Sequence, residues 1–124
     1  MGYYVEMSIE GGLIKAENTL SAFVALEKLG QTAWQNKPIK DCQDLVEALK
    51  SSRYFATKKG NSDVWIEYFD GEKLGDDAAI WEALAPHLDD TVVYCKGEDS
   101  SYWKGVIKNG SFNEANGRIV YDDE

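Results

Sequence analysis

The C-terminal part of the sequence reads TVVYCKGEDSSYWKGVIKNGSFNEA from residue 91 to residue 115. Apolar and polar residues alternate in it, and two short polar groups interrupt the alternation. This pattern predicts strands over 91–96, 102–108 and 111–115, and the second turn is Asn109-Gly110, a dipeptide favoured in tight hairpins. The stretch therefore predicts an antiparallel β-meander, with residues 119–121 as a candidate edge strand.

Three amphipathic helices are expected upstream of or between the strands. Apolar residues recur with helical spacing over 22–29, 42–49 and 80–88. A residue that can cap a helix precedes each segment, namely Asn18, Asp41, and the pair Asp76 and Asp77. Gly30 and Pro86 are expected to end the first and the third helix.

Three further strands are expected from apolar runs at 3–9, 54–57 and 64–69, and the last two form a hairpin through the polar turn 58–62. The predicted fold class is α+β, with a mainly antiparallel sheet, two to three helices on one face and the C-terminal β-meander. A chain of 124 residues fits one domain over 1–124.

Composition restricts where the chain works. Hydrophobic residues make up 44% of it, which is typical of a globular protein. Its apolar runs are far shorter than the roughly 20 residues that span a bilayer, and the N-terminus lacks the pattern of a secretory signal. We therefore expect a cytoplasmic protein without a membrane partner. Cys42 and Cys95 lack a metal-binding or redox spacing and are interpreted as buried thiols.

The net charge of −9 is unevenly distributed along the chain. Residues 1–62 contain eight basic and seven acidic residues, whereas residues 63–124 contain five basic and fifteen acidic residues. An acidic field repels the phosphates of nucleic acids and favours a basic protein partner. We therefore expect a basic protein partner and no direct nucleic-acid binding. The alternative is that the acidic residues only keep the protein soluble.

The sequence contains no recognisable catalytic constellation. His87 is its only histidine, so one chain cannot assemble a multi-histidine metal site. No serine lies in a glycine elbow, and the paired acidic residues are explained as helix caps or turn residues. We therefore expect no enzymatic activity, no cofactor and no metal site.

Aromatic and acidic residues in the middle of the chain predict an interaction surface. Alternation places Trp65, Glu67 and Phe69 on the strand face opposite Val64, and Trp81 lies on the flank of its helical stripe. Exposed aromatic residues beside acidic ones are typical of protein-binding patches, although loops can also cover them. The predicted partner-binding residues are Trp65, Glu67, Phe69, Glu72, Asp76, Asp77 and Trp81.

Residues 64–112 resemble a family of small bacterial and phage proteins that has no established activity. The resemblance rests on GEKLGDD at 71–77, ALAP at 83–86 and GED at 97–99 with Trp103. It implies an association with phages or mobile elements, and it implies no reaction.

The sequence therefore favours a non-enzymatic interaction protein whose acidic C-terminal half binds a basic partner. A sharper alternative is an acidic inhibitor of a nucleic-acid-binding protein, of the DNA-mimic or anti-defence type. A third alternative is a small-ligand or metal-dependent carboxylate site at a subunit interface. The sequence does not predict the oligomeric state.

Overall fold

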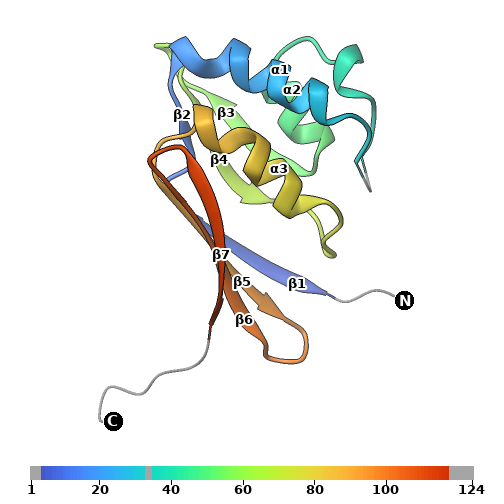
Figure 1. Cartoon of the computed structure of the whole chain (residues 1–124). Coiled ribbons are helices and arrows are strands. Elements are labelled where there is room, and N and C mark those ends of the chain that lie inside the picture. The colour runs from blue at the N-terminus through green and yellow to red at the C-terminus, as the bar shows by residue number, and fades with distance from the viewer. Residues whose placement is uncertain (1–3, 33–34, 118–124) are drawn as a thin grey trace.

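A computed structural model describes residues 4–32 and 35–117, and it confirms an α+β fold with three α-helices and two antiparallel sheets (Figure 1). The α-helices are α1 (Thr19–Leu29), α2 (Leu45–Ser51) and α3 (Asp77–Leu84). The strands are β1 (Val5–Glu10), β2 (Leu13–Ile14), β3 (Tyr54–Lys58), β4 (Val64–Phe69), β5 (Thr91–Gly97), β6 (Tyr102–Lys108) and β7 (Ser111–Gly117). The candidate edge strand at 119–121 lies outside the described residues.

The strands form one sheet in the order β1-β5-β6-β7 and another in the order β2-β4-β3. The predicted meander is confirmed as β5, β6 and β7, and the predicted hairpin is confirmed as β3 and β4. The division into two sheets occurs at Gly11 and Gly12, whose φ angles are 96° and 88°. These left-handed conformations, which favour glycine, redirect the chain, so that β1 pairs with β5 and β2 pairs with β4.

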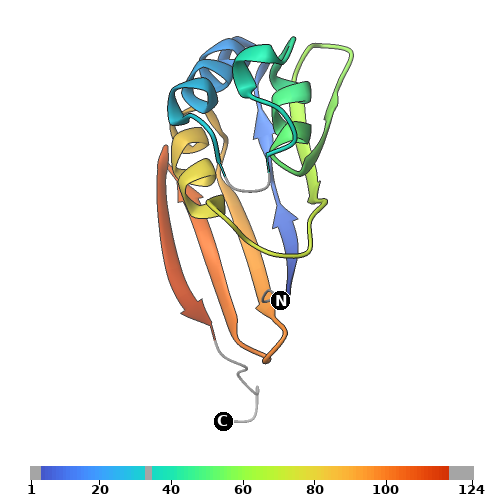
Figure 2. The same ribbon diagram turned by 90° about the vertical axis from the view of Figure 1, so that its right-hand side faces the viewer.

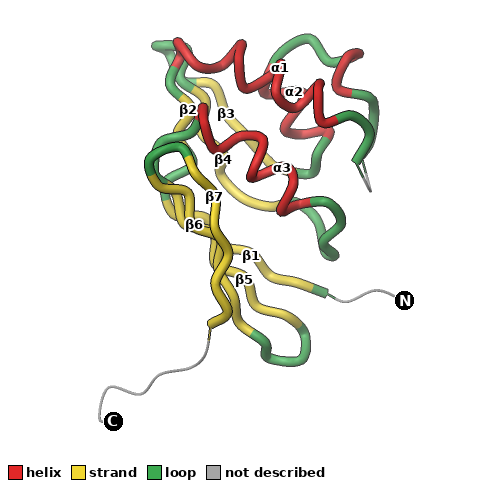
Figure 3. The backbone as a smooth tube through the Cα atoms, viewed as in Figure 1, coloured by secondary structure: helices red, strands yellow, loops and turns green. Residues whose placement is uncertain are grey.

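The three helices lie on the same side of the strands (Figure 2). Helix α1 packs against both α2 and α3. The core lies between the helices and the strands and includes Leu26 and Leu49 from the helices and Ile14 and Ile66 from the strands. The start of β1 and the β5–β6 turn extend beyond the helices (Figure 3). One face of the four-stranded sheet is therefore left without a helical cover.

Helix α2 begins three residues later than Asp41, the predicted cap, would place it. Asp41 ends a short 3-10 turn, Ile39–Asp41, and the residue before α2 is Asp44. The Asp44 carboxylate accepts a hydrogen bond from the Glu47 backbone N–H at 3.0 Å. The prediction of Asp41 as the cap is wrong because the chain after Pro38 first completes the 3-10 turn and only then becomes α-helical. Cys42 is buried, as predicted, but lies before the helix.

No helix among the described residues is long and apolar enough to cross a membrane.

Candidate functional site

The outer face of the β3–β4 hairpin carries a cluster of aromatic side chains. The rings of Phe55 and Tyr68 stack with their centres 5.0 Å apart and their planes 15° apart. Tyr68 is 48% exposed, and Trp65 on the same strand is half-buried. Glu67 lies between Trp65 and Tyr68 and is exposed. We call Phe55, Trp65, Glu67 and Tyr68 the hairpin patch.

A β-bulge decides which aromatic residues belong to this patch. Phe55 pairs with Tyr68 and Ala56 pairs with Ile66, so Glu67 is an extra residue in β4. An extra residue interrupts the alternation of side chains between the two faces of a strand. Tyr68 consequently points outward, and Phe69 is turned into the core, where it is 9% exposed. The prediction that Phe69 shares the face of Trp65 is therefore wrong.

Trp81 also lies in the core, contrary to the interpretation that it is available to a partner. It is 3% exposed, and its indole N–H donates a hydrogen bond to the Tyr54 hydroxyl at 3.0 Å. The two rings meet edge to face, with an interplanar angle of 83°. The flank of the α3 stripe is buried because Tyr54 on β3 packs against it.

Asp77 is a buried acceptor rather than a surface charge. Its carboxylate accepts hydrogen bonds from the Tyr54 hydroxyl at 2.7 Å, the Gly75 backbone N–H at 2.8 Å and an Arg53 guanidinium N–H at 3.2 Å. Arg53 also donates to the Lys73 carbonyl at 2.6 Å. Burial raises the pKa of Tyr54 well above its ordinary value, and the Asp77 charge adds to this effect. These hydrogen bonds hold the loop between β4 and α3 against β3.

The remaining predicted residues lie on the surface but not in one cluster. Glu67 accepts a hydrogen bond from the Thr57 hydroxyl at 2.6 Å within the hairpin patch. Glu72 and Asp76 are exposed in the loop before α3. The Glu72 carbonyl accepts a hydrogen bond from the Val5 backbone N–H at 2.8 Å, which ties this loop to the start of β1. The sequence pattern did not indicate the stacked pair of Phe55 and Tyr68. Strict alternation along β4 places Tyr68 on the buried face, and the bulge that exposes it leaves no signal in the sequence.

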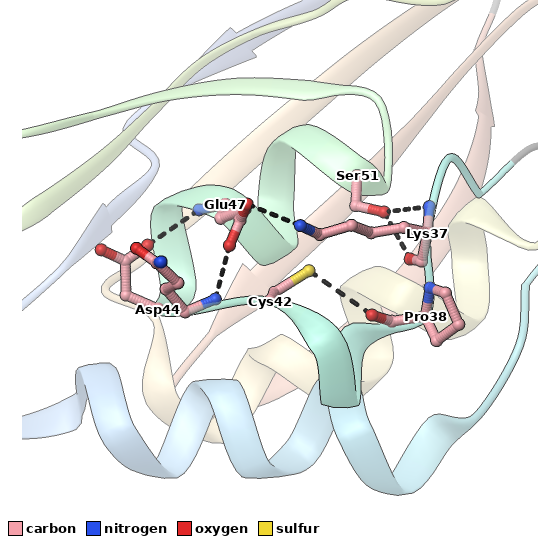
Figure 4. A network of polar contacts seen from close by, with 7 residues as sticks. Lys37, Pro38, Cys42, Asp44, Glu47 and Ser51 are labelled. Atoms are coloured by element: carbon pink, nitrogen blue, oxygen red, sulfur yellow. Dashed lines mark hydrogen bonds and ion pairs between the residues drawn. The ribbon is translucent and has the colours of Figure 1, made fainter.

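A second polar network joins the segment before α2 to that helix (Figure 4). The Lys37 ammonium lies 2.8 Å from a Glu47 carboxylate oxygen. The Ser51 hydroxyl donates to the Lys37 carbonyl at 2.6 Å, and the Cys42 thiol donates to the Pro38 carbonyl at 3.6 Å. These contacts hold the segment before α2 against that helix. None of them activates a nucleophile.

The two cysteines are expected to be unreactive in the folded protein. Burial raises the pKa of the Cys42 thiol. The pKa of the Cys95 thiol is raised to about 11, mainly by burial and to a lesser extent by the negative charge of Glu114. The thiolate is the reactive form, so both groups stay protonated near pH 8. We expect labelling by a thiol-specific disulfide reagent at pH 8 to run at least about tenfold slower in the native protein than in denaturant. Equal rates would contradict the buried positions.

The described residues offer limited support for a small-molecule or metal site. No three His, Cys, Asp or Glu side chains among them are placed to hold a metal ion. A largely apolar cleft of about 240 Å³ lies between α1, α2 and the β3–β4 hairpin, with Phe23, Val46 and Val64 in its lining. Its polar lining residues, Lys58 among them, form no catalytic arrangement of nucleophile and base.

Comparisons with known proteins leave the family open. No protein-family model matches the chain, and neither the curated proteins nor the solved structures contain a match to it.

Proposed function

We propose that this protein is a non-enzymatic interaction module that binds a basic protein partner through the hairpin patch. The observation that carries the proposal is the stacked pair of Phe55 and Tyr68, with the Tyr68 ring about half exposed and the exposed Glu67 preceding it in β4. A stacked aromatic pair loses little conformational freedom when it is buried, and tyrosine and tryptophan are enriched among the residues that dominate binding energy. The patch therefore combines a rigid apolar anchor with an exposed carboxylate, which pairs with Lys59 at 3.8 Å within the chain.

The chemistry of the patch favours a cationic side chain of the partner. Lysine and arginine are attracted to the faces of aromatic rings within about 6 Å. The chain itself places the Lys50 ammonium 5.4 Å from the centre of the Phe55 ring. Glu67 and Asp70, which flank Tyr68 closely in the sequence, are both exposed and carry negative charge. We propose that an arginine or lysine of the partner occupies the exposed face of Tyr68.

The distribution of acidic residues favours this general form over a DNA mimic. Exposed carboxylates occur on β1, on α1, before α2, on β4 and on α3, at Glu6, Glu27, Asp44, Glu67 and Glu82. A mimic of the DNA backbone requires rows of charges with the spacing of phosphates on one face. The proposed setting is the cytoplasm, with the phage or mobile-element association that the resemblance implies.

Affinity capture from the lysate of the source cells tests the proposal, followed by calorimetry with the purified partner. We expect a partner with a basic surface, and we expect Tyr68→Ala to weaken its binding about 10- to 100-fold, as for an interface hot spot. Glu67→Lys reverses a charge at the patch, so we expect it to weaken binding more at low salt than at high salt, where the charges are screened.

Glu27→Lys on α1 is the matched control, because Glu27 is an exposed acid that lines a different cleft, with Gln35 and Lys40 and without any hairpin residue. It should leave the affinity unchanged within about twofold. An acidic partner, or equal loss of affinity in Glu27→Lys and Glu67→Lys, would refute the role of the hairpin patch.

A further inference from the structure

The open face of the four-stranded sheet is a second surface with a different composition. Residues of β5 and β6 that point away from the helices alternate with buried residues such as Val93 and Ile107. The outward tyrosines and lysines are Tyr94, Lys96, Tyr102, Lys104 and Lys108. We call this set the tyrosine-lysine face. It belongs to a different sheet from the hairpin patch.

The strand register arranges these side chains in a diagonal pattern. Tyr94 is directly opposite Lys104, and Lys96 is directly opposite Tyr102, so each ring has a lysine beside it across the strand pair. The Lys96 ammonium lies 6.0 Å from the centre of the Tyr102 ring. Ser8 on β1 and Ala115 on β7 continue the row of Tyr94 and Lys104 on either side. Both neighbours are small, and the Tyr94 ring is 44% exposed.

The charge of this face is opposite to the net charge of the protein. The outward positions of β5, β6 and β7 include three lysines, and none of those described is Asp or Glu. The carboxylates on the same face are Glu6 and Glu10 on β1 at its edge. Lys96, Lys104 and Lys108 form no salt bridge within the described part of the chain. Glu6 lies directly opposite Lys96 across the strand pair, so the positive charges that remain open to a ligand are those of Lys104 and Lys108.

We propose that the tyrosine-lysine face binds single-stranded nucleic acid. Bases of a single strand stack on aromatic side chains, while lysines neutralise the phosphates between them. Tyr94 and Tyr102 lie on adjacent strands at diagonal positions, which places them roughly 7 to 8 Å apart, close enough for neighbouring bases. The face has both elements of such a site, the open ring of Tyr94 beside the half-buried Tyr102, and the cations Lys104 and Lys108, which form no salt bridge among the described residues. An acidic peptide would use these elements only in part.

The net charge of −9 restricts the strength and the form of this binding. Acidic residues elsewhere on the surface repel a rigid duplex, whereas a short flexible strand can lie within the lysine-bearing part of the face. We expect a Kd on the order of 10 to 100 µM at low salt, within the range of non-specific binding. The local positive charge of the tyrosine-lysine face thereby allows binding of single-stranded nucleic acid, which the net negative charge of the chain disfavours.

Fluorescence anisotropy with a labelled ten-nucleotide single-stranded RNA tests the proposal. Two phosphate contacts, from Lys104 and Lys108, give a slope of about −1.4 in a plot of log K against log salt, so raising salt from about 50 to 150 mM should weaken binding about fivefold. Tyr94→Ala should weaken binding by about 5- to 100-fold at constant salt, as expected for the loss of one stacked base. Lys104→Gln should reduce the slope by about 0.7.

Matched variants on the other sheet separate this proposal from the hairpin patch. Tyr68→Ala removes an equally exposed tyrosine, and Lys59→Gln removes a lysine that pairs with Glu67. Both should bind the RNA like wild type, and circular dichroism should show that all variants are folded. The proposal fails if wild type gives no saturable signal, if Tyr94→Ala binds like wild type, or if a duplex binds as tightly. Equal displacement by a ten-residue polyglutamate peptide would assign the face to an acidic protein instead.

Discussion

Asp77→Ala is expected to destabilise the folded chain by about 3 to 5 kcal/mol, the typical effect of removing one partner of a buried ion pair. Asp77 is 3% exposed and satisfies donors from three places, the Tyr54 hydroxyl, the Arg53 guanidinium and the Gly75 backbone. The substitution leaves the charge of Arg53 without its carboxylate, and it leaves the Tyr54 hydroxyl without its acceptor. The free energy of unfolding can be measured by urea denaturation followed by circular dichroism.

A control on the same helix separates loss of this network from loss of any acidic residue. Glu82 is exposed on α3, so Glu82→Ala should change the free energy of unfolding by less than about 0.5 kcal/mol. Asp77→Asn keeps an acceptor but loses the charge, and it should fall between wild type and Asp77→Ala. If Asp77→Ala loses less than about 1 kcal/mol, the buried ion pair does not hold the loop before α3.

Gly12→Ala is expected to cost about 3 kcal/mol, from two separate sources. Gly12 has a φ of 88°, and a left-handed conformation costs a residue with a β-carbon roughly 1 to 2 kcal/mol. A β-carbon at this position would lie 2.6 Å from the Ile66 carbonyl oxygen, which belongs to the backbone of β4. Relief of that contact requires movement of a strand, and such overpacking typically costs roughly 1 to 3 kcal/mol.

Gly110→Ala is the matched control, because it tests the conformational part of this effect without a close contact. Gly110 has nearly the same φ, 80°, in the β6–β7 turn, but a β-carbon there would meet other atoms only at 3.7 Å or more, an ordinary contact distance. Thermal or urea denaturation should therefore show a loss of roughly 1 to 2 kcal/mol for Gly110→Ala, clearly less than for Gly12→Ala. Equal losses would show that the approach of Gly12 to β4 is relieved at no cost.

The Gly12 position also matters for the two proposed surfaces, because it joins the two sheets that carry them. Its N–H donates a hydrogen bond to the Thr91 hydroxyl at the start of β5, and its carbonyl accepts one from the Ile66 backbone N–H on β4. One residue thereby connects the sheet of the tyrosine-lysine face to the sheet of the hairpin patch.

Local patterns in the sequence predict most of the secondary structure but only part of the candidate site. Alternation over 102–108 and the dipeptide Asn109-Gly110 depend on neighbouring residues, and the β6–β7 hairpin forms where they predict it. In β4, alternation likewise predicts the surface position of Trp65 and Glu67. Phe69 departs from it because the bulge at Glu67 depends on pairing with β3, which is not encoded in the period of β4.

The sequence by itself determined the α+β class, the three helices, the meander and the absence of clustered histidines, because these depend on residue type and on spacing along one segment. Only the tertiary structure decided that Asp77 and Trp81 are buried. Both form hydrogen bonds with Tyr54, which lies on β3, 23 or more residues earlier in the sequence. It also decided that the lysines of β5 and β6 share one open face within an acidic protein, because strand register rather than sequence distance brings them together.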